Sequence, residues 1–194
     1  MIAIIDVTGN NLTSLVNSIR RLGFDCVLTH SQEQILQASH VILPGVGAAP
    51  IAMQALHEHQ LVQVLQQLQQ PLLGICLGMQ LLFEHSQEGN VACLGVLNGE
   101  VERIPSKKGF SVPHMGWNRL HWCRDSVLGE YVYFVHGFAV RLTEYTVASC
   151  QYSMDFSAVV QKDNIFGMQF HPEKSAGAGL KLLQNFLDLT VPFM

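Results

Sequence analysis

The sequence of 194 residues is 48% hydrophobic and carries a formal net charge of −4 at pH 7. A chain of this length and composition can bury a substantial core, and its simplest organisation is one domain over residues 1–194. The acidic excess, 15 acidic against 11 basic residues, gives no basic footprint for nucleic acid or for an anionic membrane. Neither is therefore expected as a partner.

Three further features indicate where the protein works. The start, Met1-Ile-Ala-Ile-Ile-Asp6, lacks the basic segment of a signal peptide, and no stretch approaches the roughly 20 apolar residues of a membrane span. The five cysteines are an odd, scattered set without a Cys-x-x-Cys pair, so reduced thiols are expected. We expect a cytoplasmic protein whose low charged fraction, 13%, indicates a partner that covers apolar surface.

The first part of the chain alternates short apolar strands with helices. Strands are predicted over 2–5, 24–28 and 40–43, with helices between them over 12–22 and 32–37. This alternation predicts an α/β fold with a parallel sheet, whose functional loops lie at the carboxyl ends of the strands.

The third strand ends in the glycine-rich segment Pro44-Gly-Val-Gly-Ala-Ala49. Its glycines allow backbone N–H groups to point at an anion, although a plain turn explains the same residues. The next segment, 51–68, is predicted as one helix. Its His57-Glu-His59 is more typical of a solvated face than of a metal site, because residues i and i+2 diverge on a helix.

Cys76 lies where the periodicity of the sequence changes. Residues 72–75 form an apolar run that predicts a buried strand, whereas 77–84 predict a helix. Gly74 and Gly78 flank the cysteine and allow a sharp strand-to-helix turn. At such a turn the free N–H groups of the helix favour a thiolate and can bind an oxyanion.

Two polar residues, Gln80 and Glu84, lie one and two turns beyond Cys76 on the predicted helix and therefore point to the same pocket. A lone cysteine after an apolar strand is more often a small buried hydrophobe. The flanking glycines and the polar helix face favour a nucleophile instead, provided that a histidine elsewhere acts as its base.

After the helix the pattern changes to short strands separated by turns. They are predicted over 101–104, 117–122, 131–135, 145–150, 158–161 and 165–170. One hairpin turn is expected near Lys162-Asp-Asn164, and an amphipathic helix over 179–189 closes the chain. The C-terminal half is therefore predicted to add an antiparallel extension to the sheet.

The predicted strand 165–170 delivers His171-Pro-Glu173 at its carboxyl end. Pro172 stiffens the turn, so that His171 leaves the strand in a fixed direction and Glu173 can fold back towards the imidazole. A carboxylate behind a histidine holds one tautomer and makes the ring a better base. The sequence therefore predicts a triad of Cys76, His171 and Glu173.

The sequence closely resembles the class I, or triad, glutamine amidotransferases in two segments, Gly74-Ile-Cys-Leu-Gly-Met-Gln80 and Gln169-Phe-His-Pro-Glu-Lys-Ser175. The order of the motifs, a glycine-rich loop, then the cysteine, then His-x-Glu, matches this class over nearly the whole chain. Within this class, Pro113-His-Met-Gly-Trp-Asn118 is similar to the glutaminase subunits of imidazole glycerol phosphate synthase, from histidine biosynthesis. The resemblance implies a flavodoxin-like parallel, or mixed, sheet flanked by helices, as the patterning independently indicates.

The resemblance also implies the chemistry. Cys76 attacks the side-chain amide of glutamine through a thioester, and His171, oriented by Glu173, moves the protons. The backbone groups implied to bind the oxyanion belong to Gly45, Val46, Gly47 and Leu77. The residues implied to hold the amino-acid end of glutamine are Gln80 and Glu84. No metal or organic cofactor is implied.

The implied partner is a (β/α)8-barrel cyclase subunit that forms a heterodimer with this chain and uses the ammonia. The residues implied to lie at the interface are His114, Met115, Trp117, Asn118 and Lys174. The pattern departs from the family at Gly137 and Phe138, where Ser or Thr followed by Tyr is common.

Three other hypotheses remain open on the sequence. The chain could be a catalytically weak subunit that docks on a synthase and regulates it, although an intact triad argues against this. It could serve another amidotransferase, such as anthranilate synthase. An unrelated thiol hydrolase would share the turn at Cys76 but would not explain Pro113-His-Met-Gly-Trp117.

Overall fold

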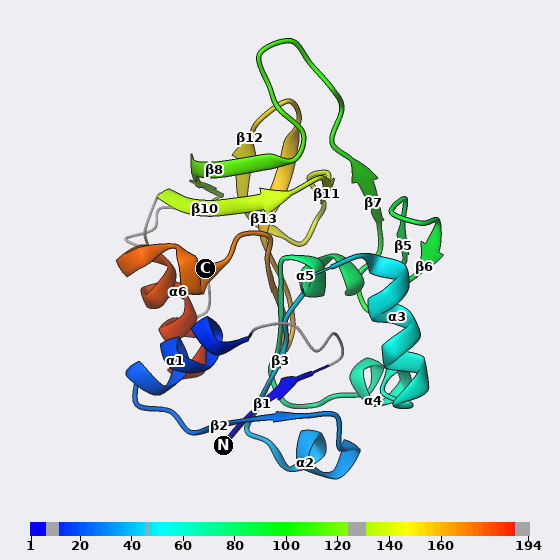
Figure 1. Ribbon diagram of the computed structural model, residues 1–194, viewed down its shortest axis with the longest axis vertical. Helices are drawn as coiled ribbons and strands as arrows, with labels where there is room; N and C mark the ends of the chain where they lie inside the picture. Colours follow the sequence, from blue (N-terminus) through cyan, green and yellow to red (C-terminus); the bar gives the residue numbers. More distant parts are fainter. Residues whose placement is uncertain (7–11, 46, 124–130, 189–194) are drawn as a thin grey trace.

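The computed structural model describes residues 1–6, 12–45, 47–123 and 131–188. An eight-stranded sheet forms its centre (Figure 1), in the order β2-β1-β3-β4-β14-β13-β12-β9. These strands span, in chain order, β1 Ile2–Ile5, β2 Cys26–Thr29, β3 His40–Leu43, β4 Leu72–Ile75, β9 His121–Trp122, β12 Thr146–Gln151, β13 Asp155–Lys162 and β14 Ile165–Met168.

The sheet has a parallel part and an antiparallel part. Strands β2, β1, β3, β4 and β14 are parallel, and β13, β12 and β9 continue the sheet in antiparallel pairs. The parallel order is that of flavodoxin-like folds. The predicted fold class, including its antiparallel extension, is therefore confirmed.

Helices cover both faces of the sheet, which explains why the parallel strands β1, β4 and β14 are buried at every position. Ile2 and Ile4 of β1 pack on the side of α1 (Thr13–Arg21) and α6 (Ala176–Asp188). Ala3 and Ile5 face the opposite core. That core is covered by α2 (Gln32–Gln37), α3 (Ala49–Glu58), α4 (Val62–Gln66) and α5 (Leu77–Leu81). Figure 1 shows α1 and α6 on one side of the sheet and α3 to α5 on the other.

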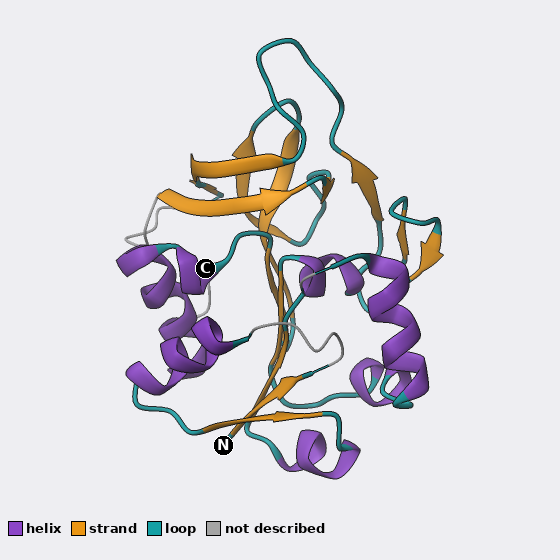
Figure 2. Cartoon of the chain, viewed as in Figure 1, coloured by secondary structure: helices purple, strands orange, loops and turns teal. Residues whose placement is uncertain are grey.

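Two smaller sheets lie beyond the carboxyl ends of the parallel strands (Figure 2). One pairs β8 (His114–Arg119) with β10 (Tyr131–His136) in antiparallel register. The other has the order β11-β7-β5-β6, from Phe138–Val140, Glu100–Arg103, His85–Ser86 and Val91–Ala92. Both sheets therefore lie next to the loops that follow the parallel strands.

Two predicted helices end earlier than the sequence pattern suggested. The segment 51–68 divides into α3 and α4, because Gln60 adopts a left-handed backbone conformation, φ 56°, between them. Helix α5 stops at Leu81, and the chain then turns so that Glu84 N–H donates to the Gly99 carbonyl, 3.2 Å. The prediction of a helix over 77–84 was therefore wrong at its C-terminal end.

Other expectations differ in detail. The strand predicted over 117–122 is two strands, β8 and β9, and β5, β6 and β11 were not predicted. The hairpin near Lys162 is confirmed, since Lys162 pairs with Ile165. The last residue predicted for the closing helix, Leu189, lies outside the described residues. Among the helices that are described, none is long and apolar enough to cross a bilayer.

Candidate active site

Cys76 is the single residue between β4 and α5, and its backbone has φ 53° and ψ −111°. A side chain in this left-handed region is strained, so the surrounding structure must hold it there. A Cβ on Gly78 would lie 1.8 Å from the Leu43 carbonyl oxygen, and one on Gly74 would lie 2.6 Å from the Gly78 oxygen. Both glycines are therefore required for the turn, as the sequence predicted.

His171 leaves β14 beside Cys76. The Cys76 N–H donates to the carbonyl of Met168, 2.7 Å, which ties the two strand ends together. Glu173, on the short 3-10 turn Pro172–Lys174, places Oε1 2.9 Å from His171 Nδ1. The Ser175 hydroxyl donates to the His171 carbonyl, 2.7 Å. The turn thus folds the carboxylate back onto the imidazole.

The charge state of His171 is set by competing effects. Burial lowers its pKa, whereas hydrogen bonds to Cys76 and Glu173 and the negative charges of both raise it. The second group of effects prevails, so the pKa of His171 lies well above its ordinary value. An imidazolium beside a thiolate is the state that follows proton transfer from Cys76.

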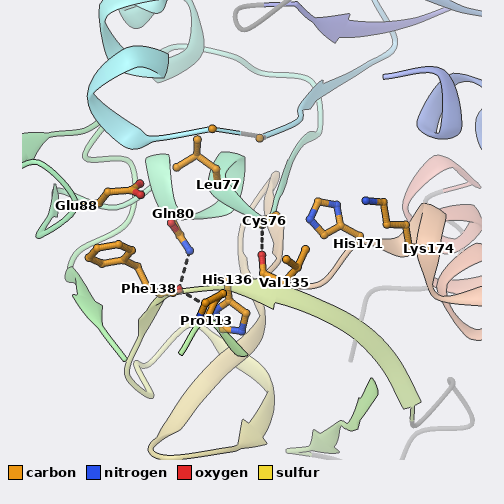
Figure 3. A pocket seen from close by; sticks show the side chains of 13 residues that line it. Cys76, Leu77, Gln80, Glu88, Pro113, Val135, His136, Phe138, His171 and Lys174 are labelled. Carbon is orange, nitrogen blue, oxygen red and sulfur yellow. Dashed lines mark hydrogen bonds between the residues drawn. The ribbon is translucent and has the colours of Figure 1, made fainter. Parts of the chain in front are cut away.

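Cys76 lines a cavity of about 310 Å³ (Figure 3). Seven of its lining residues were predicted to act in catalysis, in binding or at the interface: Gly45, Gly47, Cys76, Leu77, Gln80, His171 and Lys174. The others are Glu88, Pro113, Val135, His136, Gly137 and Phe138. The two positions that depart from the family pattern, Gly137 and Phe138, therefore lie at the pocket. Val46 lies outside the described residues.

One predicted pocket residue lies elsewhere. The Glu84 carboxylate accepts the Gly99 N–H, 2.8 Å, and does not line the cavity, because α5 ends before it. Glu88 lines the cavity instead, and its Oε2 accepts the Ala49 N–H, 2.8 Å. No helical spacing from Cys76 could have identified Glu88, since it follows the unpredicted strand β5.

The predicted interface residues divide between the two faces of β8. His114 is buried and Asn118 is half-buried, whereas Met115 and Trp117 are 61% and 54% exposed. Alternation of side chains along a strand produces this division. Tyr131, across the sheet on β10, is also exposed. Lys174 is exposed at the pocket rim.

A chain of hydrogen bonds links the inner face of β8 to the pocket. His136 Nδ1 donates to the Phe138 carbonyl, 2.8 Å, which leaves Nε2 to accept from His114 Nδ1, 3.1 Å. His114 Nε2 then accepts from the Asn118 amide, 3.4 Å. Burial lowers the pKa of His114 to about 4 and that of His136 to about 3, so both rings are neutral. No role was predicted for His136 from the sequence, although period-two alternation over 131–136 places its side chain on the inward face of the strand.

Nothing in the described part of the chain suggests a metal centre, because no group of three His, Cys, Asp or Glu side chains is arranged to hold an ion. His59 instead stacks on His30, with ring centroids 4.3 Å apart.

The chain matches the sequence model of the class-I glutamine amidotransferases over residues 3–189. It therefore belongs to that family. Among solved structures it is similar to a glutamine amidotransferase, with TM-score 0.77, 20% identity and 97% of each chain covered. It is also similar to PurLQS from Thermotoga maritima, with TM-score 0.69, 18% identity and 98% of each chain covered. At these identities the likeness shows the fold.

Among curated proteins the chain is similar to subunits of one enzyme of this family, imidazole glycerol phosphate synthase. The imidazole glycerol phosphate synthase subunit HisH 2 of Legionella pneumophila (strain Paris) is 55% identical, over 97% of this chain and 98% of its own. The subunit HisH of Xanthomonas campestris pv. campestris (strain 8004) is 49% identical, over 98% of both chains. That of Idiomarina loihiensis is 47% identical, also over 98% of both.

Proposed function

We propose that this chain is the glutaminase subunit of imidazole glycerol phosphate synthase, and that it supplies ammonia to a cyclase subunit. The observation that carries the proposal is the contact of the buried Cys76 and His171 with the half-buried Glu173, in a chain 55% identical to a HisH subunit. We also propose that residues 1–194 form one glutamine amidotransferase domain and that the protein acts in the cytoplasm. The match over 3–189 and the five free thiols support these two points.

The proposed reaction begins with transfer of the Cys76 proton to His171. The thiolate attacks the side-chain carbonyl carbon of glutamine, a C–S bond forms, and the carbonyl electron pair moves to oxygen. When that pair returns, the C–N bond breaks and ammonia leaves with the proton from His171. His171 next takes a proton from water, whose oxygen attacks the thioester carbon; the C–S bond breaks, and the Cys76 thiolate regains its proton from His171. The products are glutamate and ammonia, and Glu173 stabilises the imidazolium throughout.

We assign the oxyanion to backbone N–H groups of Leu77 and of the loop residues Gly45, Val46 and Gly47. The packing of this loop on the turn at Cys76 supports the assignment, since a Cβ on Gly45 would lie 2.2 Å from the Gly78 nitrogen. Removal of one such donor typically costs about 10²–10³ in turnover.

We assign the amino-acid end of glutamine to Gln80 and Glu88. A carboxylate suits the ammonium group of the substrate, and Glu88 supplies it from the cavity wall where Glu84 does not. Gln80 Nε2 donates to the Phe138 carbonyl, 2.8 Å, and to Gln169 Oε1, 3.0 Å, as Figure 3 shows for the first of these. Its carbonyl oxygen is therefore the group offered to the ligand.

We propose that the outer face of the β8 and β10 pair docks on a (β/α)8-barrel cyclase. This docking face consists of Met115, Trp117 and Tyr131, and exposed methionine and aromatic side chains of this kind are enriched where proteins bind one another. Strand β10 also touches the catalytic groups. Its Tyr133 carbonyl accepts the backbone N–H of His171, 3.1 Å, and its Val135 carbonyl accepts the proton of the Cys76 thiol, 3.9 Å. Lys174 is exposed at the rim of the cavity beside Cys76 and His171.

In the proposed complex the cyclase uses the ammonia on a phosphoribulosyl formimino carboxamide nucleotide. The products are imidazole glycerol phosphate and aminoimidazole carboxamide ribonucleotide. Glutamate release by the purified chain, with and without the cyclase and its nucleotide, tests the proposal. We expect release to rise by orders of magnitude in the complex. Complexes that release no glutamate would favour a regulatory subunit, and capture of an anthranilate synthase from native extract would favour that enzyme.

A further inference from the structure

Gln169 is a polar side chain with no exposed surface, and the proposed reaction does not use it. It follows β14 and precedes His171 by two residues, so its backbone belongs to the same strand end as the catalytic histidine. Burying a carboxamide is costly unless its donors and acceptor are all engaged. The partners of Gln169 therefore indicate what it does.

The orientation of the Gln169 carboxamide follows from its neighbours, beginning at the Phe138 carbonyl. This oxygen can only accept, so the Gln80 atom 2.8 Å from it must be the donor Nε2. The same Nε2 lies 3.0 Å from Gln169, which must present Oε1 to it. The Gln169 amide nitrogen is thereby directed at Cys76 Sγ, 3.8 Å away.

The sulfur of Cys76 thus has two polar neighbours of opposite character besides His171. The Val135 carbonyl, 3.9 Å away, accepts the proton of a neutral thiol and repels a thiolate (Figure 3). The Gln169 N–H donates to the sulfur and binds more strongly when the sulfur is charged. Without Gln169, the carbonyl would favour the protonated, unreactive form.

We propose that Gln169 is a further catalytic residue, a hydrogen-bond donor that favours the thiolate form of Cys76 and fixes the direction of the sulfur. Gln80 and the Phe138 carbonyl hold its carboxamide in the donating orientation. The inference deepens the proposed glutaminase function and rests on it, because only that reaction gives the thiolate a task.

The rate at which iodoacetamide alkylates Cys76 tests the proposal, measured against pH on the full chain by mass spectrometry of the Cys76 peptide. Gln169→Met keeps the length of the side chain and removes the donor. We expect the midpoint of the Cys76 profile to rise by about one pH unit, the usual scale of a charge-assisted hydrogen bond. In the complex, turnover near pH 7 should fall by about tenfold and recover at higher pH.

The control is Gln161→Met on the neighbouring strand β13. The side-chain oxygen of Gln161 is buried and has no hydrogen-bond partner among the described residues. This variant should leave the Cys76 midpoint unchanged. A second measurement needs no variant: the side-chain amide NMR signal of Gln169 in the wild-type chain should shift with pH at the same midpoint as alkylation.

Either an unchanged midpoint in folded Gln169→Met or a Gln169 signal that ignores Cys76 ionisation would overturn the inference. Neither measurement needs glutamine or a cyclase. An unchanged midpoint in a chain that releases glutamate with the cyclase would therefore refute the role of Gln169 alone. A shifted midpoint in a chain that releases none would refute the proposed function instead.

Discussion

His171 Nδ1 lies 2.9 Å from Oε1 of Glu173, with one proline between the two residues and with side chains that are 5% and 10% exposed. Since a carboxylate can only accept, Nδ1 of His171 carries a proton whether the ring is neutral or charged, and Nε2 exchanges the other proton with the Cys76 thiol. The second Glu173 oxygen, Oε2, is buried and has no hydrogen-bond partner among the described residues. The imidazole of His171 is therefore the group that the Glu173 carboxylate stabilises.

Glu173→Gln tests this relationship with little change in shape. The amide lacks the charge that stabilises the imidazolium, and its NH2 group can donate to Nδ1 and favour the wrong tautomer. We expect glutamate release by the complex to fall by about 10²–10⁴, with synthesis from added ammonium salts preserved. Unchanged glutamate release would refute the orienting role of Glu173.

Stability should depend on pH through the pair His114 and His136. Their pKa values are lowered by burial to about 4 and about 3, from 6.5 in an unfolded chain. Between pH 6.5 and 4 the unfolded chain therefore binds more protons than the folded one, and acid favours unfolding. The stabilisation is complete above pH 6.5 and is lost as the pH falls.

Urea unfolding at pH 7, 6 and 5 measures this dependence. Each histidine should contribute a slope approaching about 1.4 kcal/mol per pH unit below pH 6. The control is His57→Gln, which removes an exposed histidine and should leave the slope unchanged. A free energy of unfolding that stays constant from pH 7 to pH 5 would show that the two rings titrate normally.

Trp117→Ala tests the docking face. The side chain is 54% exposed on β8 and supports no part of the core, so the variant should fold normally. Loss of an interface tryptophan typically costs about 2 kcal/mol or more, which weakens binding to the cyclase about 30-fold. Leu36→Ala, an exposed apolar residue on α2 at the far end of the molecule (Figure 1), is the matched control. Equal calorimetric affinities for the two variants would exclude this face.

Glu88→Gln and Glu84→Gln form a second matched pair, because both carboxylates accept a backbone N–H and only Glu88 lines the cavity. Loss of the charge at Glu88 should raise the KM for glutamine at least about tenfold, since a charged hydrogen bond to the substrate ammonium is lost. The KM of Glu84→Gln should stay within about twofold of wild type. The opposite pattern would return the substrate role to Glu84.

Local sequence signals were sufficient for the turn at Cys76 and for His171-Pro-Glu173. The glycines at 74 and 78 and the proline at 172 act on their immediate neighbours, so no distant contact was needed to interpret them. The parallel sheet followed from the alternation of strands and helices, which is also local.

Long-range contacts decided the rest. The end of α5, and with it the position of Glu84, depends on a hydrogen bond to Gly99, fifteen positions along the chain. Glu88 reaches the pocket from the turn after β5, a strand of two residues that is too short to show any periodicity in the sequence. Gln169 faces Cys76 because Gln80 and Phe138 fix its carboxamide, and this network draws on three separate segments.

The most direct test is Cys76→Ala in the complex with the cyclase, assayed with glutamine and, separately, with ammonium salts at a pH that supplies free ammonia. Removing the nucleophile should reduce glutamine-dependent synthesis by at least about 10³-fold. Ammonium-dependent synthesis should match wild type, because the cyclase needs only ammonia from this chain. Synthesis from glutamine that persists in Cys76→Ala, or loss of both activities together, would contradict the account.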